Sequence, residues 1–512
     1  MPTALLSVSD KTGLTLLAEG LLGMGWELLA TGGTFKVLLA AGLAATEVAE
    51  YTGAPECFDG RLKTLHPKIH GGLLFKRDID THRDDAKTQG IGPIDLVVVN
   101  LYPFEATIAK ETSTFDDCIE QIDIGGPAMI RSAAKNHASV TVLTDPSQYT
   151  AFLERTKAGT WSKSDRLACA LEAFRRTATY DTVISAWMEG MAGVHGGLPR
   201  RLTLSLKSKQ SLRYGENPHQ KAGFYVRPGT GAWGLAACEQ LQGKELSYNN
   251  LLDSDGAERA VWQMGETACV IVKHNNPCGV GLGDSVQEAF LKAHQCDTTS
   301  AYGGIAAFNA PLDVQTALSM APTFWEVILA PGFTPEALEV FAAKKNLRLL
   351  QTPHGWPLSE AGLDIRSVGG GFLLQGPDDC FAPVESWETK AAGSGPRPSD
   401  RDLMLAQAVA KAVKSNSIVL VKDGGTVGIG AGQMSRVDSV GIACRKAGAR
   451  AAGAVLGSDA FFPFTDALEL AAAKGVAAFI EPGGSVRDAE VVEAAKKLGV
   501  WLFFTGMRHF RH

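Results

Sequence analysis

A lysine and a histidine stand side by side directly after an apolar segment in the second half of the sequence. Residues 268–272, Ala-Cys-Val-Ile-Val, are rich in β-branched side chains and predict a buried strand. Lys273 and His274 follow, and Pro277 and Gly279 then predict a turn. The charge of Lys273 disfavours protonation of the adjacent imidazole, which makes His274 a candidate general base. Substrate crevices in α/β sheets form at the carboxyl ends of strands, but a strand that simply ends in a polar turn explains the pattern equally well.

Two polar loops near the start of the sequence are candidates for binding an anion. The predicted strand at 5–8 leads into the loop 9–13, and the strand at 26–30 leads into the loop 31–34, Thr-Gly-Gly-Thr. A helical pattern follows each loop, so the segment reads as repeated strand–loop–helix units of an α/β domain. Backbone amides at a helix start, beside glycines and hydroxyls, suit a phosphate, although such loops are also common as plain connectors.

The segment 60–72 concentrates basic side chains between glycines. These side chains are Arg61, Lys63, His66, Lys68 and His70. His66 and His70 have the i,i+4 spacing of a helical metal site. Because Pro67 lies between them and no carboxylate is near, a loop that faces a phosphate is the better interpretation.

Further candidates follow a third predicted strand at 95–99, whose continuous apolar character indicates burial. This strand delivers Asn100 and Tyr102 to a loop at its carboxyl end. In the next predicted helix, Arg131 and Lys135 stand one turn apart on one face. Two like charges at that spacing repel unless an anion lies between them, which modestly favours a functional role over a solvated face.

The composition predicts an ordinary cytoplasmic protein of several domains. A chain of 512 residues is too long for one core, and 45% hydrophobic and 20% charged residues are typical of globular proteins. The net charge of -6 argues against a general nucleic-acid binder. Nine cysteines without a CxxC pair favour reduced thiols over a disulfide framework. We find neither a signal peptide nor an apolar run long enough to cross a bilayer, so no membrane association is expected.

Two glycine-rich segments bear on the organisation of the chain. Residues 193–201 are a plausible interdomain link. Gly428, Gly430 and Gly432 alternate as in a dinucleotide fingerprint, but they lie on a strand that returns from a hairpin signal at 423–425. A dinucleotide site needs the glycines between a first strand and a helix, so we do not expect one here.

Ten sequence words, in one order, resemble a known family from end to end. They are SVSDKTG, ATGGT, GRLKTLHPKIHGG, NLYPF, QIDIGGPAMIRSAAKNH, LRYGENPHQ, VKHNNPCG, SNSIVLVKDGGTVGIGAGQMSR, SDAFFPF and MRHF. The family is the bifunctional AICAR formyltransferase/IMP cyclohydrolase of purine biosynthesis.

The resemblance implies an α/β fold in two regions. Residues 1–195 would form a doubly wound, methylglyoxal-synthase-like domain that closes the purine ring to give IMP. Residues 200–512 would form two cytidine-deaminase-like α/β subdomains, about 200–375 and 376–512, that transfer a formyl group from the co-substrate 10-formyltetrahydrofolate to AICAR. The expected partners are AICAR, formyl-AICAR, IMP and folate, without nucleic acid or membrane, in a cytoplasmic homodimer whose transferase sites span the interface.

The resemblance also assigns residues to two sites. For ring closure, Lys135 matches the proposed proton-transfer lysine, with Lys63, Tyr102 and Asp123 as near neighbours. Nucleotide contacts in that site fall on Ser9, Asp10, Lys11, Thr31, Gly32, Gly33, Thr34, Arg61, Thr64, Asn100, Ile124 and Gly125. For formyl transfer, His274 matches the general base and Lys273 the group that stabilises the formyl oxyanion. Substrate contacts there fall on Arg213, Tyr214, Asn250, Gly303, Glu326, Asn416, Arg436, Val437, Phe461, Ser485, Val486 and Arg508, with Val437, Ser485 and Val486 on the folate side.

Two departures qualify the resemblance. Position 326 is Glu where some members carry Asp. Cytidine deaminases bind zinc through HxE and PCxxC motifs, but Cys278 has no second cysteine after it, so no metal is expected. Two other functions remain as alternatives. One is a metal-dependent nucleotide deaminase or hydrolase, and the other is a catalytically silent nucleotide-binding or regulatory protein.

Overall fold

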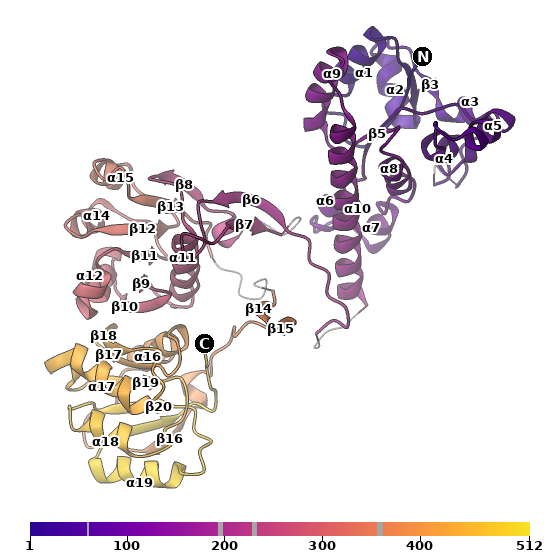
Figure 1. Ribbon diagram of the computed structural model, residues 1–512. Helices are drawn as coiled ribbons and strands as arrows, with labels where there is room; N and C mark the ends of the chain where they lie inside the picture. Colours follow the sequence, from indigo (N-terminus) through magenta and orange to yellow (C-terminus); the bar gives the residue numbers. More distant parts are fainter. Residues whose placement is uncertain (59–60, 193–197, 228–232, 356–361) are drawn as a thin grey trace. The chain divides into compact units, whose positions relative to one another are not determined.

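The computed structural model describes residues 1–58, 61–192, 198–227, 233–355 and 362–512. The chain forms two compact units, which are taken separately below (Figure 1). Unit 1 is Met1–Lys207 with Arg227–Gly231, and unit 2 is Ser208–Val226 with Ala232–His512. The link expected at 193–201 lies partly outside the described residues. In the described part of the chain, no helix has the length and apolar character needed to cross a membrane.

Unit 1 contains a five-stranded sheet in the order β3-β2-β1-β4-β5, with every neighbouring pair parallel. The strands are β1 (Thr3–Val8), β2 (Glu27–Ala30), β3 (Thr46–Glu47), β4 (Leu96–Asn100) and β5 (Thr141–Leu143). The chain runs outward from β1 to β3 and then returns to β4 and β5, which is the reversal of a doubly wound sheet. The expected fold of this region is thus confirmed.

Helices surround this sheet and complete its hydrophobic core. They are α1 (Leu14–Gly23), α2 (Gly32–Ala40), α3 (Val48–Thr52), α4 (Pro67–Leu74), α5 (Asp80–Thr88), α6 (Phe104–Ile108), α7 (Phe115–Glu120), α8 (Gly125–Lys135), α9 (Tyr149–Lys157) and α10 (Lys163–Met191). The side chains of β1 and β4 are almost all buried, as their continuous apolar sequences predict.

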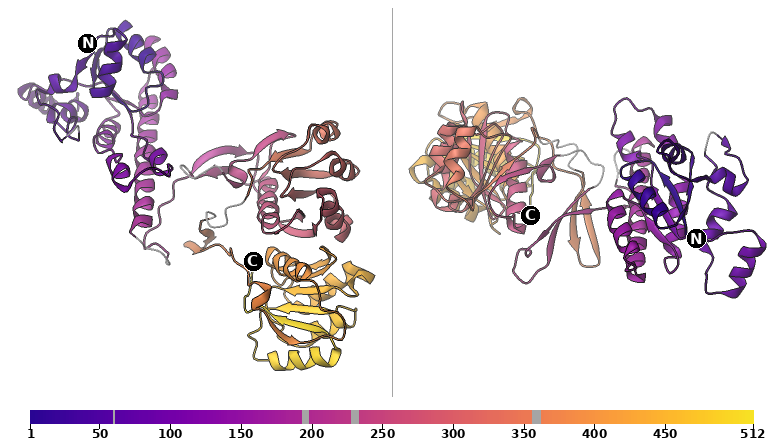
Figure 2. Two further views of the ribbon diagram at one scale, coloured as in Figure 1. Left: turned by 180° about the vertical axis from the view of Figure 1, so that it is seen from behind. Right: turned by 90° about the horizontal axis from the view of Figure 1, so that it is seen from above.

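Unit 2 contains one twelve-stranded mixed sheet with two matching halves (Figures 1 and 2). The first half is β8 (Glu239–Gln242), β9 (Ala268–Lys273), β10 (Asn276–Leu282), β11 (Gly304–Phe308), β12 (Trp325–Ala330) and β13 (Arg348–Gln351). The second is β16 (Glu388–Ala391), β17 (Ile418–Lys422), β18 (Gly425–Gly430), β19 (Val455–Ser458), β20 (Ala478–Glu481) and β21 (Trp501–Phe504). From the central pair β10–β18, both halves read outward as two antiparallel, two parallel and one antiparallel pairing. The two halves are therefore copies of one α/β arrangement.

The helices of unit 2 follow the same duplication. They are α11 (Tyr248–Val261), α12 (Val286–Cys296), α13 (Thr298–Ala301), α14 (Val314–Met320) and α15 (Pro335–Ala342) in the first half, and α16 (Asp400–Ala412), α17 (Arg436–Ala447), α18 (Asp466–Ala472) and α19 (Asp488–Leu498) in the second. Two small antiparallel sheets complete the described elements, β6 (Lys207–Leu212) with β7 (Ala222–Val226), and β14 (Asp364–Val368) with β15 (Gly371–Gln375).

The alternating glycines of β18 serve helix packing. A Cβ on Gly428 would lie 2.2 Å from the Ala443 carbonyl oxygen of α17, and one on Gly430 would lie 2.0 Å from the Ser439 carbonyl oxygen. Gly279 of β10 meets α12 in the same way, with 1.9 Å to a carbonyl oxygen. Because any larger side chain would push the helix off the sheet, the pattern is explained without a dinucleotide.

The hairpin that carries His274 differs from the expected geometry. The turn consists of His274 and Asn275, both with positive φ, and Pro277 and Gly279 belong to the returning strand β10. The turn expected at Pro277 and Gly279 is therefore wrong. Two residues with positive φ match the twist of a two-residue hairpin, and Asn adopts this conformation more readily than most residues.

Candidate active sites

A cavity of about 740 Å³ opens in unit 1 where the direction of the chain reverses between β1 and β4. It is lined by the loops after β1, β2 and β4. The carboxyl ends of parallel strands meet at this switch point, so loops far apart in the sequence become neighbours. Most of the predicted cyclohydrolase residues line it, namely Ser9, Lys11, Thr31, Gly33, Thr34, Arg61, Lys63, Thr64, Asn100, Tyr102, Asp123, Ile124 and Gly125.

Asn100 ties the loop after β1 to the end of β4. Its Oδ1 accepts hydrogen bonds from the backbone N–H of Ser9 at 2.5 Å and of Asp10 at 2.9 Å, and its Nδ2 donates to the Asp10 carbonyl at 2.9 Å. The Lys11 ammonium donates to the Val8 carbonyl and to Thr34 Oγ1. Burial is the main cause that lowers the pKa of Lys11. A cation that is partly desolvated in this way interacts strongly with an anion.

The start of α2 faces the same cavity. Its N-cap residue, Thr31, makes no side-chain hydrogen bond to the helix and instead donates to Ser7 Oγ at 2.9 Å. The first amides of α2 thus lack a side-chain cap, and they combine with the helix dipole to favour a phosphate. Lys63 adds a cation at this place, and its Nζ lies 3.9 Å from Glu56 Oε1.

Asp123 is a half-buried carboxyl of this cavity. Its Oδ1 accepts the Gly126 N–H at 2.7 Å, and its own N–H donates to the Tyr180 hydroxyl at 2.8 Å. Burial raises the pKa of Asp123, against the opposing effects of the N–H groups of Gly126 and Tyr102 and the charge of Lys63. The carboxyl therefore holds a proton more readily than a surface aspartate does.

Three predicted residues lie outside this lining. Asp10 is in the loop after β1, Gly32 is the first residue of α2, and Lys135 is exposed at the last position of α8, whose first residue borders the cavity. Of the two histidines, His66 caps α4 through Nδ1, and His70 Nδ1 lies 2.9 Å from Ser132 Oγ. Among the described residues, no group of three or more His, Cys, Asp or Glu is placed to hold a metal ion.

A second cavity, of about 1100 Å³, lies in unit 2 around the hairpin of β9 and β10. Because β9 runs antiparallel to β11, its carboxyl end lies beside the amino ends of β11 and β12. The crevice is therefore at the carboxyl end of β9, as expected, but at the amino ends of β11 and β12, which are parallel to each other. Lys273, His274, Arg213, Tyr214, Asn250, Gly303 and Glu326 all line it.

Lys273 is held by backbone oxygens. Its Nζ donates to the Tyr302 carbonyl at 3.1 Å and to the Gly303 carbonyl at 2.8 Å. Gly303 has φ +66°, and a Cβ there would lie 3.1 Å from Lys273 Nζ. His274 is exposed at the tip of the turn. The ammonium and the imidazole thus stand next to each other at the cavity wall, which is the arrangement that proton removal and oxyanion stabilisation require.

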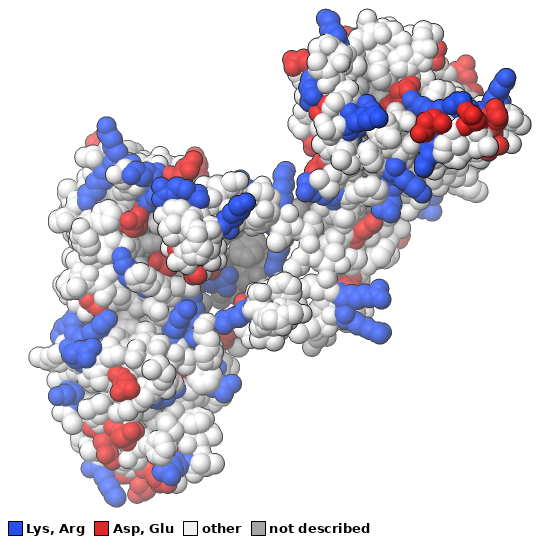
Figure 3. Space-filling model, in the orientation of Figure 1, with Lys and Arg blue, Asp and Glu red and all other residues white. Residues whose placement is uncertain are grey.

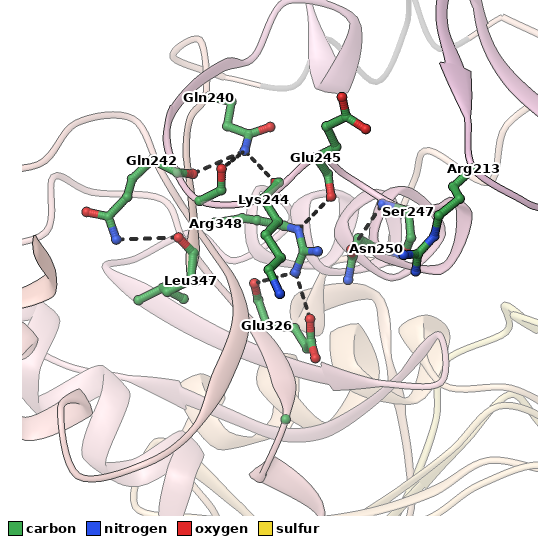
Figure 4. Close-up of polar contacts among 12 residues, drawn as sticks. Arg213, Gln240, Gln242, Lys244, Glu245, Ser247, Asn250, Glu326, Leu347 and Arg348 are labelled. Carbon is green, nitrogen blue, oxygen red and sulfur yellow. Dashed lines mark hydrogen bonds and ion pairs between the residues drawn. The ribbon is translucent and has the colours of Figure 1, made fainter. Parts of the chain in front are cut away.

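Polar contacts across the same cavity are drawn in Figure 4. Arg348 Nη1 lies 2.7 Å from Glu326 Oε2, and its Nε donates to the Glu245 carbonyl at 3.0 Å. Arg213 Nη2 donates to the Tyr214 hydroxyl at 3.0 Å. Arg348, Lys244 and Lys414 line the cavity but were not predicted. Their segments carry no motif, and only the folded sheet brings them to His274.

The remaining seven predicted residues form a separate group in the second half of the sheet and do not line this cavity. They are Asn416, Arg436, Val437, Phe461, Ser485, Val486 and Arg508. Within this set, which is called the Arg436 group below, Arg436 contacts Asn416: its guanidinium donates to Asn416 Oδ1 at 2.8 Å and to Ser458 Oγ at 2.7 Å, and it pairs with the buried Asp459. Val486 and Arg508 are exposed.

A doubly wound domain with a polar cavity at its switch point, followed by a duplicated α/β unit with a cavity of its own, is the architecture of a protein with two sites. The chain belongs to the AICARFT/IMPCHase bienzyme family, whose model matches residues 133–446, and a model of the MGS-like domain matches residues 13–128.

Named relatives span the whole chain. The bifunctional purine biosynthesis protein PurH of Cyanothece sp. (strain PCC 7425 / ATCC 29141) is 51% identical and covers 100% of both chains. The protein of the same name from Paracoccus denitrificans (strain Pd 1222) is 53% identical over 99% of this chain and 98% of its own. A solved structure, the crystal structure of ForH, matches 38% of this chain and 99% of its own at 36% identity, with a TM-score of 0.33.

Proposed function

We propose that this protein is a bifunctional enzyme of purine biosynthesis. It transfers a formyl group from 10-formyltetrahydrofolate to the 5-amino group of AICAR, and it then closes the ring of formyl-AICAR to IMP with loss of water. Membership of the bienzyme family over the full chain carries this assignment. Two separate cavities, each lined by both basic and acidic side chains, support it.

We assign formyl transfer to residues 200–512 and to the cavity at His274. The amine of AICAR is a weak nucleophile because its ring carries a carboxamide, so it needs a base. His274 accepts a proton from this amine as its nitrogen bonds to the formyl carbon. Lys273 stabilises the negative charge that develops on the formyl oxygen. The bond between the formyl carbon and the folate nitrogen then breaks, and tetrahydrofolate leaves with a proton that the protonated His274 gives to this nitrogen. The two carbonyls that hold Lys273 keep its ammonium in place for this role.

We assign ring closure to residues 1–195 and to the cavity at the β1–β4 switch point. The carboxamide nitrogen of formyl-AICAR bonds to its formyl carbon, and the formyl oxygen leaves as water. Asp123 accepts the proton, because burial raises the pKa of its carboxyl. Lys63 and Tyr102 line the cavity beside it. The helix start at Thr31 and the cation of Lys11 hold the phosphate.

A homodimer explains why the formyltransferase residues form two groups. Seven of the predicted contacts lie away from the cavity that contains His274. If a second copy presents its Arg436 group to this cavity, the substrate contacts become complete. The phosphate and carboxylate groups of the two substrates then find guanidinium groups from both copies.

The proposal includes a cytoplasmic location and a reaction without metal. All nine cysteines are free thiols, as in proteins of reducing compartments. On the face drawn in Figure 3, basic and acidic side chains are interspersed. Such a surface suits small charged substrates in local cavities better than a nucleic acid.

The test is direct. Purified protein is mixed with formyl-AICAR alone, and separately with AICAR and 10-formyltetrahydrofolate, and IMP is measured by chromatography. IMP in both mixtures supports both activities. The absence of IMP from formyl-AICAR would refute the ring-closure assignment, and its formation only in that mixture would refute formyl transfer.

A further inference from the structure

The turn that carries His274 has an unfavourable backbone conformation. His274 has φ +53° and Asn275 has φ +58°, a region that is uncommon for residues other than glycine, although Asn and His adopt it more often than most. Such a conformation persists only where surrounding contacts determine it. The position of the candidate base therefore depends on what holds these two residues.

One contact comes from α11. The Asn275 N–H donates to Asp253 Oδ1 at 2.7 Å. The second half of the sheet contains the same contact, because Gly424 in the turn between β17 and β18 donates its N–H to Asp402 Oδ1 at 2.7 Å. In both halves the carboxylate stands 22 residues before its partner. This contact is thus part of the duplicated fold and is not specific to the His274 turn.

The second contact involves the side chain of Asn275. Asn275 Oδ1 accepts a hydrogen bond from Arg511 Nη2 at 3.1 Å. Arg511 also donates through Nη1 to the Ala412 carbonyl at the end of α16, and its own carbonyl accepts the Ser415 N–H at 2.8 Å. Figure 1 shows the C-terminal end of the chain beside α16. The guanidinium therefore joins three segments that are far apart in the sequence.

The absence of a side chain at Gly256 leaves room for the Asn275 side chain. A Cβ on Gly256 of α11 would lie 2.4 Å from Asn275 Oδ1 and 3.6 Å from Arg511 Nη2. In the second half, the position of Asn275 is taken by Gly424, which adopts positive φ without strain and offers no side chain to hold. Glycine would suffice to make the turn, so the backbone conformation does not require an asparagine. What the asparagine side chain adds is its contact with Arg511.

We propose that Arg511 is a positioning residue for formyl transfer, which holds the Asn275 side chain and thereby fixes the turn that presents His274. Arg511 does not line the cavity, so it acts through Asn275 and not on the substrate. This inference rests on the proposed formyltransferase function. It adds a role for Arg511, which directly follows the MRHF word and to which the resemblance assigned no contact.

Four variants test the proposal: Arg511→Ala, Arg511→Lys, Asn275→Gly, and the double variant Arg511→Ala/Asn275→Gly. Asn275→Gly keeps the turn, because glycine accepts its φ, and removes the side chain that contacts Arg511. Since Asn275 also lines the cavity and Arg511 does not, Arg511→Ala is the decisive single variant. Each single variant should lower kcat of formyl transfer by up to about 100-fold, since a small misplacement of a catalytic group has effects of that size. KM for AICAR should change by less than about threefold. The double variant should be no slower than the single ones, and Arg511→Lys should regain part of the loss.

Ring closure by the same protein is the internal control and should keep its wild-type rate, because its cavity lies wholly in unit 1. Arg450→Ala is the matched structural control, since Arg450 also donates to backbone carbonyls in unit 2, at Gln295 and Cys296. It should leave kcat of formyl transfer unchanged.

The outcomes separate two failures. A wild-type protein that forms no formyl-AICAR would refute the proposed function. With an active wild type, unchanged kcat in Arg511→Ala, multiplied losses in the double variant, or an equal loss in Arg450→Ala would each refute the positioning role.

Discussion

Glu258 offers a quantitative test of how burial acts in this fold. It lies on α11 with only 1% of its surface exposed, and neither carboxyl oxygen has a hydrogen-bond partner among the described residues. Burial, helped by the nearby charge of Asp255, raises the pKa of Glu258 from 4.5 to about 8. The second half of the sheet has Gln407 at the corresponding place, five residues after Asp402 as Glu258 is five after Asp253. Glu258→Gln therefore copies a side chain that the same fold already buries.

The sign and size of the effect follow from these values. The folded chain holds the proton on Glu258 more tightly than the unfolded chain does, so unfolding becomes easier as the pH rises from 4.5 to about 8. At about 1.4 kcal/mol for each pH unit, the carboxyl costs the folded state ~5 kcal/mol at pH 8 and under ~1 kcal/mol at pH 5. Relaxation of the fold and entry of water reduce this cost. We therefore expect Glu258→Gln to raise the free energy of unfolding by ~2–4 kcal/mol at pH 8.

Differential scanning calorimetry of the full chain at pH 5 and pH 8 measures the effect. The transition of unit 2 should rise by ~3–6 °C in Glu258→Gln at pH 8 and by far less at pH 5. Glu490→Gln is the control, because Glu490 is exposed and should give no shift at either pH. An equal shift at both pH values, or none at pH 8, would refute the reasoning from burial.

Three further predictions concern the two sites. Under the proposed role of Asp123 as the proton acceptor, Asp123→Asn should lower ring closure by at least ~100-fold and leave formyl transfer intact; separate assays with formyl-AICAR and AICAR check this. Arg348→Met should lower kcat/KM for AICAR about 5- to 30-fold, because it removes the ion-pair partner of Glu326. The Glu326 side chain is 39% exposed, which limits the ion pair to ~1–2 kcal/mol. Unchanged steady-state kinetics would show that Glu326 needs no partner. Treatment with EDTA should leave both activities unchanged, and loss of activity that zinc restores would instead favour the metal-dependent deaminase or hydrolase.

Much of the first site could be predicted because parallel strands bring their carboxyl ends together. Ser9, Thr31 and Asn100 each follow a strand that a continuous apolar run marks clearly, so their meeting in one cavity follows from the fold class. Lys135 shows the limit of sequence words. It belongs to a matching word, yet it lies at the exposed end of α8, and its role stays a prediction.

The second site was harder to predict because its geometry depends on backbone conformation and distant contacts. Nothing in the sequence shows that His274 adopts positive φ, so the turn was placed at Pro277. Arg348 and Arg511 reach the site from other segments, through side-chain contacts that span 22 and 236 residues. Such contacts depend on three-dimensional packing and leave no periodic signal in the sequence.

The most direct test of the central claim follows IMP formation by wild-type protein and by His274→Ala. With AICAR and 10-formyltetrahydrofolate, the wild type should form IMP and release one tetrahydrofolate for each IMP, whereas His274→Ala should form almost none. Given formyl-AICAR, both should form IMP at the same rate. Undiminished IMP formation from AICAR by His274→Ala would contradict the account.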